Sequence, residues 1–138
     1  ELASIMGHEI AHALREHSRE AMSQAVAQQM GIAVLGAALN MGSLSQDMLD
    51  TAATVAIQLP NSRGKETEAD RIGLELTARA GYDPRGAVSV WKKMMANGGG
   101  QPPQFLSTHP NPEARMQDIE SYLPRVMPLY EQAHKARK

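Results

Sequence analysis

Two histidines one helical turn apart, with a glutamate between them, constrain this chain more than any other feature of its sequence. The segment reads His8-Glu9-Ile10-Ala11-His12 and matches the pattern H-E-x-x-H. On an α-helix four residues turn through roughly 400°, so the two imidazoles lie about 40° apart on one face and can share a metal ion. Glu9 lies beside them, where a carboxylate can take a proton from a metal-bound water. The segment therefore predicts a helix that carries the site of a zinc hydrolase, and among hydrolases a peptidase.

The composition fits one folded domain and excludes several classes of protein. A chain of 138 residues is long enough for a real core, so we expect a single catalytic domain over residues 1–138. Hydrophobic residues make up 42% but aromatic residues only 4%, so the core should be mostly aliphatic. A formal net charge of -1 predicts no nucleic-acid surface and no polybasic membrane patch. Without cysteine, the chain has neither a disulfide nor a thiolate metal site.

The chain begins at Glu1, inside the segment that should already be helical. We therefore expect an N-terminally truncated fragment or a processed domain, with membrane association only through regions outside this chain. The most apolar segment, residues 30–44, is interrupted by Asn40, Gly42 and Ser43. It falls short of the roughly 18 residues that a bilayer-spanning helix needs. We expect it to form a buried helix.

The spacing of apolar residues predicts a mostly α fold, with helices and no convincing strand. The first helix should run to about residue 25, or toward residue 39 with a bend near Gly31. It should bury an apolar stripe formed by Leu2, Met6, Ile10, Ala13 and Leu14.

Proline and glycine predict the boundaries of the later helices. A helix capped by Ser45 should stop at Pro60, and residues 60–64 should form a loop. The next helix should span residues 65–80 and use Gly81 as its C-terminal cap.

The signals after residue 81 complete this outline. Asp83-Pro84 should start a helix that ends near residue 97, followed by a flexible loop over residues 98–103. Another helix should begin at Asn111-Pro112, Pro124 should stop or kink it, and the tail over residues 125–138 should be helical and fray at its charged end.

A catalytic zinc usually takes three protein ligands and one water, so the two histidines need a partner from elsewhere in the chain. The best candidates are Glu66 and Asp70, four residues apart on an expected helix. Glu66 can reach the metal while Asp70 accepts a hydrogen bond from a ligand imidazole. Glu68 is the alternative third ligand. A solvated first-turn carboxylate for Glu66 and an ordinary salt bridge for Asp70 are the structural alternatives.

The remaining histidines and the larger apolar residues are expected to lie outside the site. His17 follows His12 by five residues, about 140° further around a continuous helix, and should not join it. His134 in the charged tail should be solvated, and Trp91 should be a core anchor. We expect core filler from Met94, Met95, Met116 and Met127.

Four motifs in order resemble metallopeptidase family forty-eight, the gluzincin group that includes CAAX prenyl proteases and HtpX-type proteases. They are residues 7–12, residues 62–73, Gly81-Tyr82-Asp83-Pro84 and Ser107-Thr108-His109-Pro110, with Arg115 five residues after the last. The resemblance runs from the first residues to about Leu123. The chain is most similar to the soluble bacterial envelope-associated members, because the membrane-embedded members carry long apolar spans that it lacks.

The resemblance implies a zincin-like core built from the H-E-x-x-H helix and a second, Glu-bearing helix. It implies that His8, His12 and Glu66 bind zinc and that Glu9 is catalytic. In zincins the region before the first of these helices normally supplies the sheet that holds an extended peptide, and that region is missing here.

Two residues have roles that only the resemblance suggests. His109 is similar to a family histidine placed to touch the zinc, the substrate or the oxyanion, although a histidine before proline in a loop is more often structural. For Arg115 two interpretations stay open, contact with a carbonyl or carboxylate in the cleft and a helix-surface ion pair.

The leading hypothesis is a zinc-dependent endopeptidase with one Zn²⁺ per chain and a polypeptide substrate. By resemblance, the substrate would be unfolded or misassembled protein and the location the periplasmic side of the bacterial envelope. The alternative is a latent protease that acts mainly as a chaperone-like binding module, with His109 in the open zinc position. A purely structural zinc site is a third hypothesis, and Glu9 speaks against it because such a site needs no general base.

Overall fold

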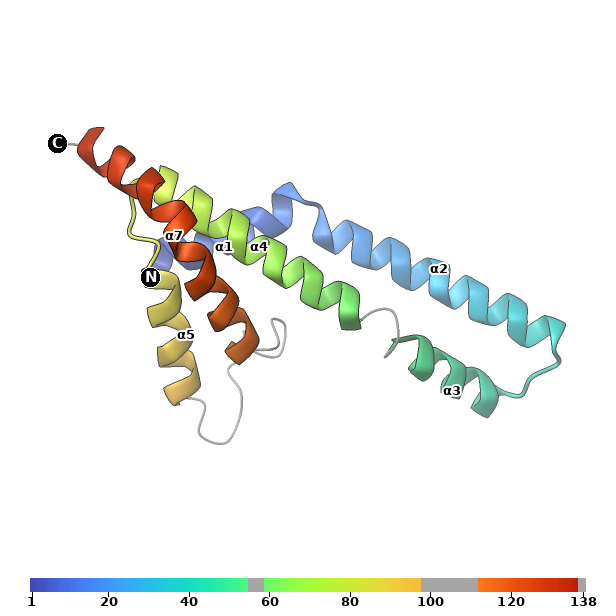
Figure 1. Cartoon of the computed structure of the whole chain (residues 1–138). Helices are drawn as coiled ribbons and strands as arrows, with labels where there is room; N and C mark the ends of the chain where they lie inside the picture. Colours follow the sequence, from blue (N-terminus) through green and yellow to red (C-terminus); the bar gives the residue numbers. More distant parts are fainter. Residues whose placement is uncertain (55–58, 98–111, 137–138) are drawn as a thin grey trace.

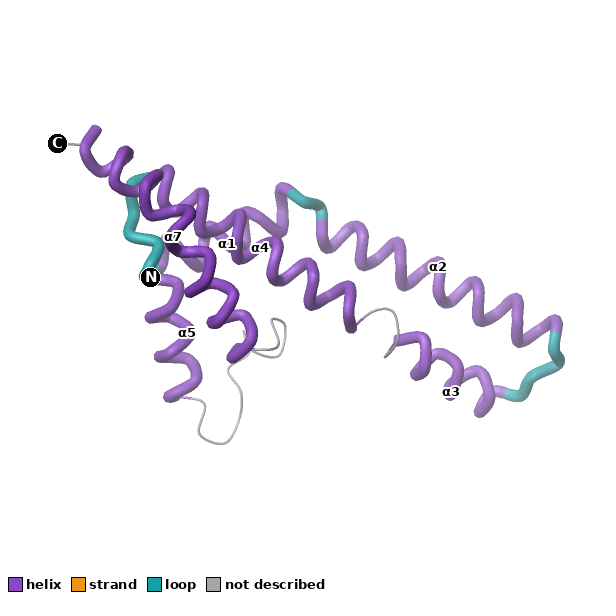
Figure 2. The backbone as a smooth tube through the Cα atoms, in the orientation of Figure 1, coloured by secondary structure: helices purple, strands orange, loops and turns teal. Residues whose placement is uncertain are grey.

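Helices account for nearly all of the chain that this computed structural model describes, namely residues 1–54, 59–97 and 112–136 (Figures 1 and 2). Within those ranges no strand occurs, which confirms the predicted helical class. The helices are α1 (Leu2–Leu14), α2 (His17–Ala38), α3 (Ser43–Ala53), α4 (Leu59–Arg79), α5 (Gly86–Asn97) and α7 (Pro112–Ala136).

Helix α4 crosses α1 at a point where both helices carry glycine. A Cβ atom on Gly7 would lie 2.7 Å from the Gly73 carbonyl oxygen, and one on Gly73 would lie 2.8 Å from the His8 backbone nitrogen. These distances are too short for any side chain, so the two backbones touch. The contact sets His8 on α1 directly beside α4, which carries the candidate carboxylates.

The apolar core lies between α4, α5 and α7. Its buried residues are Leu74, Ala78, Ala87, Val88, Trp91, Ile119 and Val126. Trp91 is 4% exposed, so its predicted role as a core anchor is confirmed. Met94 and Met116 pack against this cluster, as expected of flexible filler.

The first helix ends earlier than its sequence suggests. Helix α1 stops at Leu14, and Glu16 adopts a left-handed conformation with φ 52° before α2 begins at His17. The prediction of one helix to about residue 25 was therefore wrong. A non-glycine residue in this conformation is uncommon and turns the chain sharply, which re-aims every residue after it.

Some helix boundaries differ from those predicted from proline and capping residues. Pro60 lies in the first turn of α4, where its missing N–H removes no helical hydrogen bond, so residues 60–64 are helical and not a loop. Helix α3 begins at Ser43, after an N-cap at Gly42, and not at Ser45. Helix α7 continues through both Pro124 and Pro128.

The end of α4 follows the prediction. Gly81 has φ 74°, the left-handed conformation that glycine adopts without strain. Its N–H donates to the Ala78 carbonyl at 2.9 Å, and the Tyr82 N–H donates to the Thr77 carbonyl at 3.1 Å. This pair of bonds is a Schellman cap. One Asp83 carboxylate oxygen then accepts the Arg85 N–H at 2.9 Å just before α5.

Two apolar surfaces that were expected to be buried are exposed. The α1 stripe is open to solvent at Leu2, Met6, Ile10, Ala13 and Leu14. Residues 30–39, which form the end of α2 and its C-cap, are likewise largely exposed, so the expected buried helix over residues 30–44 was wrong. Helical periodicity identifies an apolar face but does not say what covers it. In the described ranges, no helix is both long and apolar enough to cross a membrane.

Candidate metal centre and active site

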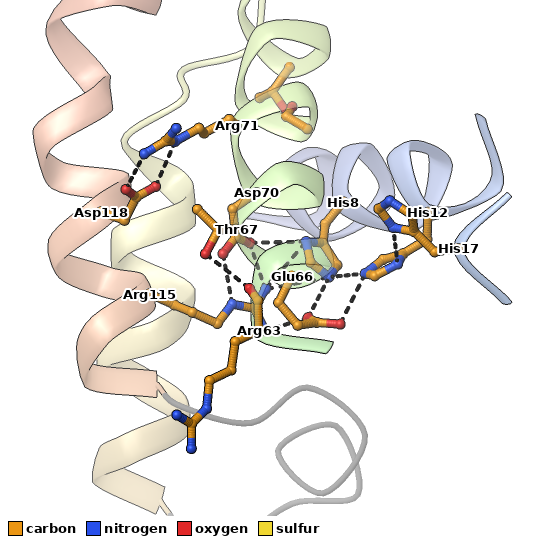
Figure 3. A network of polar contacts seen from close by, with 12 residues as sticks. His8, His12, His17, Arg63, Glu66, Thr67, Asp70, Arg71, Arg115 and Asp118 are labelled. Carbon is orange, nitrogen blue, oxygen red and sulfur yellow. Dashed lines mark hydrogen bonds and ion pairs between the residues drawn. The ribbon is translucent and has the colours of Figure 1, made fainter. Parts of the chain in front are cut away.

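Helices α1 and α4 bring His8, His12 and Glu66 together at one point (Figure 3). The Nε2 atoms of the two histidines lie 3.0 Å apart. Glu66 Oε2 lies 3.5 Å from His8 Nε2, and Glu66 Oε1 lies 3.3 Å from His12 Nε2. His8 and Glu66 are buried and His12 is half-buried. Two turns of α1 and one of α4 thus aim three donor atoms at a common centre.

The chemistry and spacing of these donors fit zinc. Ligand atoms about 2.0–2.1 Å from a tetrahedral ion lie roughly 3.3 Å from one another. The two histidine Nε2 atoms are 3.0 Å apart, and the two Glu66 oxygens lie 3.5 Å from His8 Nε2 and 3.3 Å from His12 Nε2, one oxygen to each ring. Two imidazoles and one carboxylate form a borderline-soft set that suits zinc better than magnesium or calcium. His8, His12 and Glu66 would hold the ion, which leaves one position for water.

Asp70 holds the outer side of the His8 ring. Its Oδ1 lies 2.9 Å from His8 Nδ1, so the ring's other nitrogen points toward Glu66. Burial lowers the pKa of the His8 imidazole, but the hydrogen bonds that Asp70 and Glu66 accept from the ring outweigh burial and raise that pKa above its usual value. This is the placement expected of a carboxylate that orients a metal ligand.

Arg115 lies beneath the site and contacts both carboxylates. Its Nη1 is 2.7 Å from Glu66 Oε2, its Nε is 2.7 Å from Asp70 Oδ2, and its Nη2 is 2.6 Å from Asp70 Oδ1. Its guanidinium also lies over the Trp91 ring, 4.5 Å from the centroid. With 3% exposure, Arg115 is not a helix-surface residue. Contact with substrate stays a prediction for it.

Of the two catalytic candidates, the structure describes Glu9 only. Glu9 follows the candidate ligand His8 on α1 and is exposed. His109 lies outside the described residues, so its predicted role and the latent-protease alternative both stay predictions.

His17 lies against the site, which the helical spacing did not predict. Its Nδ1 is 3.0 Å from His12 Nδ1 (Figure 3). Its Nε2 is 3.1 Å from Glu68 Oε2. Glu68 points toward His17 and Arg15 instead of into the cluster of donor atoms. The signal missed in the sequence is the break between α1 and α2, because on a continuous helix His17 would face another side.

Comparison with known proteins agrees with this geometry. Residues 1–123 match the profile of peptidase family M48. The chain belongs to peptidase family M48. The family match spans α1 to α5 and the first half of α7, and it therefore includes every residue of the candidate centre.

Several M48 relatives align over almost the whole chain. Mitochondrial metalloendopeptidase OMA1 of Saccharomyces cerevisiae is 33% identical over 96% of this chain, and its Schizosaccharomyces pombe counterpart is 38% identical over 91%. The β-barrel assembly-enhancing protease of Escherichia coli is 32% identical over 96%. The alignments cover 39%, 37% and 29% of these longer proteins, respectively. No solved structure matches the chain.

Membership of M48 fits the arrangement found here. The family consists of peptidases, and the relatives named above are metalloendopeptidases or proteases. In this member the two-helix arrangement that presents two histidines and one glutamate is complete within residues 8–66.

Proposed function

We propose that residues 1–138 are the catalytic domain of a zinc-dependent endopeptidase that holds one zinc ion per chain. The observation that carries this proposal is the convergence of His8, His12 and Glu66, whose donor atoms all lie within 4.8 Å of one another. An exposed glutamate, Glu9, follows the first ligand. A structural zinc site would use four protein ligands and no general base, so this donor set supports a catalytic one.

The residues of the chain divide the chemistry between them. Zinc, when bound, would polarise the scissile carbonyl and acidify the attacking water. Glu9 takes the proton from that water and returns it to the leaving amine. Asp70 fixes the His8 ring, and Arg115 balances the negative charge that Glu66 and Asp70 bring into a buried position.

Zinc analysis and a proteolysis assay with Glu9→Gln test the proposal. Purified protein should carry about one zinc per chain, and the variant should keep the metal while it loses cleavage of an unfolded protein substrate. Glu20→Gln, which changes an exposed carboxylate on α2, is the matched control and should cleave normally. Unchanged cleavage by Glu9→Gln, or a wild-type chain without zinc, would contradict the proposal.

We further propose that the substrate is unfolded or misassembled protein in the bacterial envelope, on its periplasmic side. The bacterial relatives, which carry the name β-barrel assembly-enhancing protease, support this assignment. Other relatives are mitochondrial. Fractionation of the source cells, and a comparison of cleavage of one protein in its folded and unfolded forms, test location and substrate separately.

A further inference from the structure

Helices α2 and α3 form an arm that the proposed peptidase chemistry does not use. The arm, residues 17–53, extends away from the helices that form the metal centre and core (Figure 1). Its two helices are tied together by Gln28, whose Nε2 donates to Asp50 Oδ1 at 2.8 Å. The arm therefore ends in a helical hairpin whose tip is the turn between α2 and α3.

Charge is absent from the outer part of this arm. Residues 21–46 contain no Asp, Glu, Lys, Arg or His, although they make up more than half of the arm. Within them, residues 30–39 carry no polar side chain at all. We name residues 30–46 the arm tip.

The apolar side chains of the arm tip are exposed on more than one side of α2. Met30 is 64% exposed and Leu39 is 68% exposed. They are nine residues apart, so they face about 180° away from each other. Val34 and Leu35, between them, are also more than half exposed. A partner protein or a second copy would cover one stripe, whereas lipid surrounds a helix on all sides.

The length of the apolar run fits one leaflet of a bilayer. Ten helical residues span about 15 Å, which is half of a hydrocarbon core of about 30 Å. This agrees with the finding that no described helix could cross a membrane. Asp47 limits insertion from the α3 side, because it lies five residues after Gly42, or about 7 Å along the helix. Interfacial helices reach about 5–10 Å into the headgroup and acyl boundary.

From this charge pattern and exposure we propose that the arm tip inserts into one leaflet of a lipid bilayer. The tip has no basic residue, so apolar burial drives the contact and anionic lipid is not required. The proposal does not depend on the metal centre.

Flotation of the protein with vesicles of pure phosphatidylcholine tests the proposal. We expect the wild-type chain to float with the vesicles at both low and high salt. Leu39→Asp should lower the floating fraction by on the order of tenfold or more, because it places a charge at the tip. Met22→Asp is the matched control, since Met22 is exposed on α2 but lies about 25 Å along the helix axis from Leu39, the C-cap of that helix.

Circular dichroism and zinc content show whether each variant keeps its fold. Three results would overturn the proposal: no flotation of the wild type, flotation only with anionic lipid and only at low salt, or equal flotation of the two variants. A wild-type dimer that Leu39→Asp dissociates, without vesicle binding, would assign the arm tip to contact between copies and would also overturn it.

His17 lies at the base of the arm and supports a second, independent inference. It is 5% exposed and contacts the candidate ligand His12 on one side and Glu68 on the other. The left-handed Glu16 breaks the helix directly before His17, so His17 does not lie where a continuous helix would put it. Such a residue is kept only where the surrounding contacts favour it.

The hydrogen bonds that link His12, His17 and Glu68 can all point the same way, from His12 toward Glu68. If His12 Nε2 faces zinc, its Nδ1 carries the proton and donates to His17 Nδ1. His17 Nε2 then carries its own proton and donates to Glu68 Oε2. The carboxylate thus fixes the tautomers of both rings, as Asp70 does directly for His8.

The geometry points to His17 as a positioning residue that holds the His12 ring for zinc, with Glu68 as the outer anchor. This inference rests on the proposed zinc site. Zinc affinity, measured by competition with a chromophoric chelator, should fall roughly 10–100-fold in His17→Phe. His17→Asn, whose carbonyl oxygen can still accept the His12 proton, should restore most of the affinity.

Glu68→Gln tests the anchor without changing a buried side chain, and Glu20→Gln is its control. We expect a several-fold loss of zinc affinity in Glu68→Gln and a change in the ¹⁵N chemical shift of His12 Nδ1 in His17→Phe. If the wild type binds no zinc, the proposed function fails. If the wild type binds zinc and His17→Phe and Glu68→Gln bind it equally well, the positioning role alone is wrong.

Discussion

His8 Nδ1 lies 2.9 Å from Asp70 Oδ1, and this contact leaves Nε2 of the same ring facing Glu66. The ring is therefore held in a single orientation by a residue from another helix. A neutral imidazole has one donor and one acceptor nitrogen, so the carboxylate also selects the tautomer that can bind a metal.

Replacement of Asp70 should weaken zinc binding without removing a ligand. We expect Asp70→Ala to lower the zinc affinity roughly 10–100-fold, because the His8 ring loses the group that orients it. Chelator competition measures this. Asp118→Asn is the control. The Arg71–Asp118 ion pair joins α4 to α7, as Asp70 does through Arg115, but it lies away from the site. Equal losses in the two variants would show a general loosening of the helices.

Gly73→Ala should disturb the site by separating α1 from α4. Its new Cβ would lie 2.8 Å from the His8 nitrogen, a backbone atom that cannot move alone. We expect a loss of roughly 1–3 kcal/mol in unfolding free energy, together with weaker zinc binding. Urea unfolding of the zinc-free protein measures the first effect.

Gly64→Ala is the matched control on the same helix. A Cβ there meets nothing within 4 Å, so we expect stability to rise by about 0.5–1 kcal/mol through better helix propensity. If both substitutions destabilise the protein, the close contact between the α1 and α4 backbones does not explain the effect of Gly73→Ala.

Arg115→Met should destabilise the zinc-free protein strongly. The change leaves Glu66 and Asp70 buried without their cation, and removing one partner of a buried ion pair costs about 3–5 kcal/mol. It also removes the guanidinium from the Trp91 ring. Arg71→Lys is the comparison, because the Arg71–Asp118 pair is partly exposed and should be worth less than about 1 kcal/mol. Urea unfolding curves of both variants test whether Arg115→Met loses more unfolding free energy than Arg71→Lys.

The Asp83–Arg85 pair should make stability depend on acid pH. Hydrogen bonds from Arg85 hold the pKa of the Asp83 carboxyl below its usual value. A carboxyl with a lowered folded-state pKa contributes stability above the unfolded-state pKa of about 3.9, and this contribution is lost as pH falls through the folded value. Asp83→Asn should therefore melt below the wild type at pH 6 and approach it at pH 2.5 in chelator. A constant gap would contradict this account.

The sequence was most informative where chemistry and helical spacing coincide. His8, His12, Glu66 and Asp70 could be placed on shared helical faces because four residues return the chain to nearly the same side. The position of Gly81 was equally accessible, since its left-handed conformation is a local property of the chain.

Long-range contacts were not accessible in this way. His17 was expected to face away because nothing in the local pattern predicts a left-handed glutamate at position 16. The exposed stripe on α1 has the periodicity of a buried one, because burial depends on what packs against a helix. Pro60 was interpreted as a stop and Pro124 as a stop or a kink, although proline is tolerated in a first turn and, at a cost, within a long packed helix.

The arm leaves the rest of the molecule beside the point where α4 approaches it, with Lys65 Nζ 3.4 Å from Glu20 Oε2. Helices α1 and α4 contact each other directly, so their packing does not depend on the length of the segment between positions 20 and 65. The length and the composition of this segment can therefore change with little effect on the geometry of the candidate site. Insertions and deletions among homologues should therefore concentrate in this segment. The spacing from Glu66 to Gly73 should stay fixed, because one extra residue between them would rotate Glu66 by about 100° around the helix relative to Gly73.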